Sequence, residues 1–134
     1  MKRGVYLASS WAIKALTHAR RNELIASGVP VNSTWTLQQD KNGHELSESE
    51  MRKTAASDTK EARASELVLV DMTVKSSTGG WVTEMGICLG AGSTLWVIGD
   101  RSRETNIFAR LADRWFDSYE DARAALLDLH ARRN

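Results

Sequence analysis

Short apolar runs alternate with longer, partly polar segments along the chain. Three runs, at residues 5–8, 67–70 and 94–98, have the length and composition of buried β-strands. Residues 67–70 are leucine and valine only, which is typical of a central parallel strand buried on both faces. Pro30 precedes a further apolar segment, and we predict a strand over residues 31–35.

The segments between these runs have the pattern of helices. The first predicted helix follows Ser10, a suitable N-cap, and ends near Gly28. Lys14, His18 and Arg21 share one face of it, which we predict to be solvated. A polar stretch at residues 38–47 is predicted to be a loop. The other predicted helices cover residues 48–65, residues 80–90, and a C-terminal segment with a capping box of Ser118 and Asp121.

Strands that alternate with helices predict a single α/β domain. We expect a Rossmann-like, flavodoxin-like fold: an open, mainly parallel sheet of about five strands flanked by helices. In such sheets ligands bind beyond the carboxyl ends of the strands, near the point where the strand order reverses. This rule selects residues 6–11, the region after residue 35, and residues 71–84 and 99–108 as the candidate binding region.

The composition narrows the classes of function. The net charge of +1 gives no general attraction to a nucleic-acid polymer or to an anionic membrane. No apolar run is long enough to span a bilayer. The single cysteine, Cys88, and three scattered histidines have no metal-ligand spacing, and we expect Cys88 to be a small buried hydrophobic residue. We therefore predict a cytoplasmic protein that acts on a small molecule without a metal or a cofactor.

Glu84 is the first candidate for chemistry. Its helical neighbours at three and four residues are Gly80, Trp81, Ile87 and Cys88, so it lies on an apolar face. A carboxylate in such a setting requires hydrogen bonds or neutralisation. We expect the nearby helix N-terminus to help to keep Glu84 ionised. The alternative is a glutamate that is only held by backbone amides at the helix start.

Asp58 is the second candidate, because it falls on the thin apolar stripe of the polar helix at residues 48–65. An inward aspartate that caps a neighbouring loop is the alternative, and it applies equally to Asp71 at a strand end. Two carboxylates that converge on one crevice are what glycosyl transfer uses, one as nucleophile and one as acid. The pair Asp58 and Glu84 therefore predicts this chemistry.

Three segments also resemble one enzyme family. They are Val-Tyr-Leu-Ala-Ser-Ser-Trp at residues 5–11, Asp58 followed by residues 65–71, and Thr-Gly-Gly-Trp-Val-Thr-Glu-Met-Gly at residues 78–86. In this order they are similar to the nucleoside 2-deoxyribosyltransferases and to the related deoxynucleoside monophosphate N-hydrolases. The resemblance implies one nucleoside deoxyribosyltransferase-like domain over residues 1–134.

The resemblance also implies roles for individual residues. Glu84 is the expected nucleophile, Asp58 the acid, and Tyr6 a residue beside the nucleophile. Asn106 resembles a polar residue that reaches the sugar from a neighbouring subunit, which implies a homodimer or higher homo-oligomer with shared sites. The expected substrate-binding residues are Ser10, Trp11, Trp35, Asp71, Thr78, Gly79, Gly80, Asn106 and Phe108.

The sequence departs from the family pattern at two positions. Thr78 stands where the transferases usually have an aspartate, and it is closer to the serine of the N-hydrolases. Ala12 stands where the hydrolases have an arginine for the phosphate. Lys14, Arg101 or Arg103 can supply that charge, or they are ordinary solvated charges.

We therefore predict cleavage of the N-glycosidic bond of a 2′-deoxynucleoside or its 5′-monophosphate. The acceptor is water in an N-hydrolase and a second base in a deoxyribosyltransferase. The alternative is a binding module that captures a nucleotide or a nucleotide-derived signal in the same pocket without catalysis.

Overall fold

The computed structural model describes residues 4–38, 46–75 and 79–133 and has one parallel sheet with the strand order β1-β2-β3-β4. The strands are β1 (Val5–Ala8), β2 (Leu67–Asp71), β3 (Thr94–Ile98) and β4 (Arg114–Phe116). The helices are α1 (Lys14–Ala26), α2 (Glu48–Ala64), α3 (Gly80–Ala91) and α4 (Tyr119–Arg133), with 3-10 turns η1 (Trp11–Ile13), η2 (Trp35–Leu37) and η4 (Ile107–Leu111).

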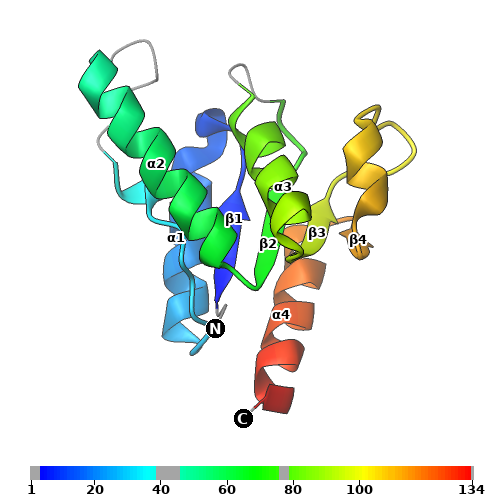
Figure 1. Cartoon of the computed structure of the whole chain (residues 1–134). Helices are drawn as coiled ribbons and strands as arrows, with labels where there is room; N and C mark the ends of the chain where they lie inside the picture. Colours follow the sequence, from blue (N-terminus) through cyan, green and yellow to red (C-terminus); the bar gives the residue numbers. More distant parts are fainter. Residues whose placement is uncertain (1–3, 39–45, 76–78, 134) are drawn as a thin grey trace.

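Helices cover both faces of the sheet, so the molecule has three layers (Figure 1). One face packs against α2, α3 and η4 through a core that includes Tyr6, Val68 and Val97. The other face packs against α1 and α4 around Leu7 and Leu69. This arrangement confirms the predicted α/β class with its parallel sheet and flanking helices.

The apolar runs form strands because both faces of the sheet are covered. All five residues of β2 are buried, as predicted for a central strand. Val68 and Val70 have no exposed surface, and each such side chain contributes roughly 1.5–3 kcal/mol through burial. Parallel strands have side chains that alternate between the two faces, which decides the helix layer toward which each residue points.

The predicted strand at residues 31–35 is wrong beyond its first residue. Val31 forms a single parallel bridge with Val5, and the chain then turns into η2. Further along, side chains take the place of a strand backbone: the Leu7 N–H donates to Ser33 Oγ at 3.1 Å. The indole Nε1 of Trp35 donates to the Leu7 carbonyl at 2.7 Å. Among the described residues the sheet therefore has four strands instead of about five, and the short β4 is one that the apolar pattern did not predict.

The polar face of α1 also differs from the expectation, because it is not simply solvated. Lys14 Nζ donates to the Gln38 carbonyl, and His18 Nδ1 lies 3.0 Å from Thr36 Oγ1. Arg21 Nε donates to the Ser33 carbonyl at 2.9 Å. Residues 33–38 have few partners in the sheet, so these side chains satisfy their polar groups.

The predicted ends of the helices agree with the structure except at the start of α1, which begins at Lys14 because Ser10 caps the turn η1. Ser118 Oγ accepts a hydrogen bond from the Asp121 N–H at 3.2 Å, and Gly28 follows α1 with a φ of 89°. Helix α2 begins with a full capping box of Ser47 and Glu50. Most of the predicted loop at 38–47 lies outside the described residues. No helix in the described part of the chain has the length and apolar character required to cross a membrane.

Ser33→Ala tests whether this side chain replaces a strand at the edge of β1. The change leaves the buried N–H of Leu7 without an acceptor, which costs roughly 1–3 kcal/mol. We expect the free energy of unfolding in urea to fall by about this amount. The exposed Ser27→Ala is the control and is expected to stay within about 0.5 kcal/mol of the wild type. Equal losses in the two variants would contradict the assignment.

Candidate active site

Three polar side chains from three elements meet on the α2 and α3 side of the sheet. Tyr6 of β1 belongs to the core on this face. Asp58 lies one turn before Ala62, the buried residue of α2, and Glu84 lies beside the buried Met85 of α3. The apolar anchors of both helices thus direct the two carboxyl groups toward Tyr6.

A pocket of about 270 Å³ lies between α2 and α3 and has both carboxyl groups in its wall. Its lining among the described residues consists of Leu46, Met51, Thr54, Ala55, Asp58, Thr59, Gly80, Thr83, Glu84 and Ile87. Most of these side chains are apolar or small. A mainly apolar pocket with a few convergent polar groups is the usual form of a small-molecule site.

Three side-chain oxygens in or beside this pocket are buried without a hydrogen bond of normal geometry. Tyr6 Oη, Asp58 Oδ1 and Glu84 Oε2 are shielded from solvent and have no hydrogen bond of normal geometry to any described residue. Each buried group without a partner costs roughly 1–3 kcal/mol. Three such groups at one place are therefore expensive for the fold, and polar groups of this kind are typical of functional sites.

Burial and the charges of neighbouring carboxylates raise the pKa values of both members of the pair. Burial, followed by the charge of Asp58, raises the pKa of Glu84 to about 8, although the Tyr6 hydroxyl favours the charged form. Burial and the charge of Glu61 raise the pKa of Asp58 to about 6. Burial and the charge of Glu84 raise the pKa of Tyr6 far above its ordinary value, so the phenol remains protonated.

Burial therefore outweighs the help that was expected from the helix N-terminus in keeping Glu84 ionised. Glu84 is the fifth residue of α3, and the field of a helix end is felt mainly within the first turn. Burial dominates instead. Between about pH 6 and pH 8 the pair Asp58 and Glu84 holds one proton, which belongs to the pair and not to either residue alone. Such a pair can offer one carboxylate and one acid at the same time.

Two of the expected aromatic residues lie together beyond the carboxyl end of β1. The ring centroids of Trp11 and Trp35 are 6.1 Å apart, and the planes are inclined at 37°. Lys14 Nζ lies 4.8 Å from the centre of the Trp11 ring. Ser10 accepts a hydrogen bond from the Ala12 N–H and caps η1. These residues surround the end of β1 without lining the pocket of Glu84.

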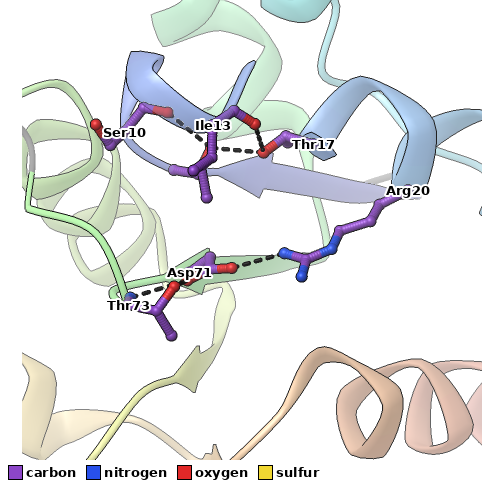
Figure 2. Close-up of polar contacts among 7 residues, drawn as sticks. Ser10, Ile13, Thr17, Arg20, Asp71 and Thr73 are labelled. Carbon is purple, nitrogen blue, oxygen red and sulfur yellow. Dashed lines mark hydrogen bonds and ion pairs between the residues drawn. The ribbon is translucent and has the colours of Figure 1, made fainter. Parts of the chain in front are cut away.

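Asp71 lies on the opposite face of the sheet from Glu84. Figure 2 shows its carboxylate directed at Arg20 of α1, with Arg20 Nη1 2.6 Å from Asp71 Oδ2. The other oxygen accepts hydrogen bonds from the N–H and the hydroxyl of Thr73. The structure thus does not bring Asp71 together with Asp58 and Glu84, and its contacts are those of the loop-capping alternative.

Of the two glycines expected to bind substrate before α3, Gly80 lines the pocket of Glu84 and Gly79 does not. Gly79 has a φ of 77°, which favours glycine, and a Cβ on Gly80 would lie 3.9 Å from Glu84 Oε1. Thr78 lies outside the described residues. Asn106 and Phe108 are not part of the pocket wall; Asn106 Oδ1 accepts from the Phe108 N–H at 2.9 Å and caps η4.

The cations considered as phosphate ligands have other contacts. Lys14 donates to the Gln38 carbonyl, Arg103 pairs with Asp100 at 3.5 Å, and Arg101 lies over the Trp115 ring. None of the three lines the pocket. In the described part of the chain no group of three or more histidine, cysteine, aspartate and glutamate side chains is placed to hold a metal ion.

Sequence reasoning missed one charged residue near the pair. Glu61 raises the pKa of Asp58 and adds to the raised pKa of Glu84. Its spacing of three residues from Asp58 places it on the same side of α2, and this spacing is the signal that would have identified it. Cys88, in contrast, is fully buried as expected.

Comparison with known proteins adds evidence on the fold. No protein-family model matches the chain, and no curated protein matches it by sequence. A solved 2-deoxyribosyltransferase from the psychrotolerant bacterium Bacillus psychrosaccharolyticus is similar with a TM-score of 0.70 and 17% identity, over 91% of this chain and 94% of that one. A conserved protein from Enterococcus faecalis V583 is similar with a TM-score of 0.64 and 14% identity, over 94% and 98%. The chain thus has the fold of that 2-deoxyribosyltransferase.

Glu84→Gln tests the burial of the carboxyl group independently of any activity. A raised pKa in the folded state means that stability is lost as the pH rises from the ordinary value of 4.5 through about 8. The glutamine of the variant has no titratable carboxyl group, so the variant avoids this loss of stability. We expect its Tm to equal that of the wild type within about 2 °C at pH 5 and to exceed it by roughly 5 °C at pH 9.

The control for this measurement is Glu48→Gln, which changes an exposed carboxylate on α2. Its Tm difference from the wild type is expected to stay constant between pH 6 and pH 9. A Glu84→Gln difference that also stays constant over this range would show that Glu84 titrates as an exposed group.

Proposed function

We propose that this chain cleaves the N-glycosidic bond of a 2′-deoxynucleoside or its 5′-monophosphate, with Glu84 as the nucleophile. The observation that carries the proposal is the convergence of Asp58 and Glu84, with buried unpaired oxygens, in the wall of a pocket of small-molecule size, with Tyr6 beside them. The fold shared with a 2-deoxyribosyltransferase supports it. This role implies a cytoplasmic enzyme of nucleotide metabolism.

The proposed reaction begins when the proton shared by the pair is on Asp58 and Glu84 is ionised. A Glu84 oxygen forms a bond to C1′ as the bond between C1′ and the base nitrogen breaks. Asp58 gives its proton to the departing base, and a deoxyribosyl ester of Glu84 remains. The Tyr6 hydroxyl favours the charged form of Glu84 and so supports the ionised nucleophile.

The second half of the reaction releases the sugar. The acceptor attacks C1′ and gives a proton to Asp58, which is now a carboxylate. The ester bond to Glu84 breaks at the same time. Water as the acceptor gives hydrolysis, and a second base gives deoxyribosyl transfer. Thr78, which resembles the hydrolase residue, favours water in this proposal.

Removal of the nucleophile tests the mechanism. Glu84→Gln is expected to lower the rate of free-base release from deoxynucleosides and their monophosphates on the order of 1,000-fold or more, and Asp58→Asn about 100-fold. Asp128→Asn, on the exposed side of α4, is the matched control and should keep the wild-type rate. Mass spectrometry of the wild type after brief exposure to mixed deoxynucleotides should detect a deoxyribosyl adduct on Glu84.

Two outcomes contradict the proposal. Unchanged turnover in Glu84→Gln would rule out this residue as the nucleophile. Tight binding of a nucleoside or nucleotide by the wild type, with no base released from any member of the panel, would instead establish the binding module that is the alternative function.

We further propose that the enzyme is a homodimer or a higher homo-oligomer. Ile107, Phe108 and Leu111 expose more than half of their surface on the short η4, beside Asn106. A cluster of exposed apolar side chains is typical of a surface that another subunit covers. In Figure 1 the η4 segment lies at the β4 end of the sheet, beside α3.

Phe108→Asp tests this surface. A carboxylate is costly to bury in a subunit contact, so we expect light scattering after size exclusion to show a monomer where the wild type is an oligomer. Leu16→Asp changes an equally exposed leucine on α1 and should leave the oligomer intact. A wild type that is a monomer at micromolar concentration would refute the proposed assembly.

A further inference from the structure

Glu61 forms a link between α2 and the segment that precedes η2. Its Oε1 accepts a hydrogen bond from the Thr34 N–H at 3.0 Å, and its Oε2 accepts one from the Thr34 hydroxyl at 2.6 Å. Hydrogen bonds to a carboxylate are stronger than those between neutral groups, and two donors from one residue fix its orientation. Neither Glu61 nor Thr34 has a role in the chemistry described above.

Thr34 is itself held to the strand that contains Tyr6. Its neighbours Ser33 and Trp35 bond to the N–H and the carbonyl of Leu7, the residue after Tyr6. A continuous set of hydrogen bonds therefore runs from β1 through residues 33–35 to Glu61 of α2. Asp58 lies one turn away from Glu61 on the same helix.

Helix α2 has few buried residues with which to hold its position. Of its seventeen residues only Ala62 is buried, while Met51 and Ala55 remain exposed. A helix with so little buried surface is weakly positioned by packing alone. The contact of Glu61 with Thr34 therefore helps to fix the distance between Asp58 and β1, while packing against α3 holds the other side of α2.

The charge of Glu61 also acts on the pair. The titratable groups that face one another here are Tyr6 from β1, Asp58 and Glu61 from α2, and Glu84 from α3. When Asp58 titrates, Glu84 still holds its proton, so Glu61 is the charge that raises the pKa of Asp58. Its effect on the pKa of Glu84 is smaller than those of burial and of Asp58.

We propose that Glu61 is a positioning residue of the active site, which fixes α2 against β1 through Thr34 and holds the shared proton on Asp58 through its charge. The inference rests on the proposed function, since it assigns Asp58 the role of the acid. Glu61 is thus a third carboxylate near the site. It touches no reacting atom, but it determines how often the shared proton is on Asp58 while Glu84 is ionised.

Two variants separate the effect of the charge of Glu61 from its effect on the position of α2. Glu61→Gln removes the charge and keeps an oxygen that can accept from Thr34, so we expect the acidic limb of the kcat/KM profile to move down from about pH 6 by about half a pH unit or more. The alkaline limb, near pH 8, is expected to move less. Because the proton then spends less time on Asp58, kcat should fall about three- to tenfold at unchanged KM.

Thr34→Val keeps the charge of Glu61 and removes one of its two donors. We expect an increase in KM of about threefold or more, with both limbs of the pH profile unchanged. Glu48→Gln is the control for the charge of α2 and should have wild-type kinetics. A Glu61→Gln enzyme with an unmoved acidic limb, or a Thr34→Val enzyme with unchanged KM, would overturn the corresponding half of the proposal.

A readout without turnover separates this inference from the proposed function. Carbon NMR of the aspartate carboxyl groups gives the titration of Asp58 directly, and Glu61→Gln should lower its midpoint by about half a pH unit or more. If no substrate is turned over but this shift is present, the reaction is wrong and the electrostatic role of Glu61 holds. An unshifted midpoint refutes the role whether or not the enzyme is active.

Discussion

The arrangement of the candidate site depends on how the backbone of Leu7 is satisfied at the edge of β1. A neighbouring strand would normally supply both hydrogen bonds, but here Ser33 Oγ and the indole of Trp35 supply them. Because these two partners are side chains, the backbone of residues 33–36 does not have to lie alongside β1. It can therefore leave the extended conformation. It turns toward α2, where Thr34 meets Glu61.

The unpaired carboxyl groups are a cost that the rest of the fold has to offset. Burial raises the pKa of Glu84 and Asp58, and at neutral pH the folded state is less stable than it would be with neutral side chains there. The compensation comes from the strands, since β2 is buried along its whole length. Sites that sacrifice stability in this way are expected where catalysis requires a poorly solvated carboxylate.

Much of the fold can be predicted from the local sequence. Hydrogen bonds from side chains to residues distant in the sequence cannot. Apolar runs predicted β1, β2 and β3 because strands buried on both faces are near-continuous hydrophobic runs. The same pattern predicted a strand at residues 31–35, which is wrong. Nothing in the local sequence indicates that the side chains of Ser33 and Trp35 will bond to the distant Leu7. The three-residue β4 is too short for a pattern. Asp58 and Glu84 were identified from apolar neighbours, and Tyr6 from the resemblance.

The alternation of side chains along a strand explains why Asp71 does not join the pair. Leu69 and Asp71 point to the α1 and α4 face, while Val70 points to the face of Glu84. The ion pair with Arg20 therefore fixes α1 to β2, and acid and base must come from α2 and α3. Helix α3 is anchored by buried residues on both sides of Glu84, whereas α2 has a single buried residue, Ala62. In the proposed reaction the nucleophile is thus held by packing, and the acid is held by the polar link through Glu61.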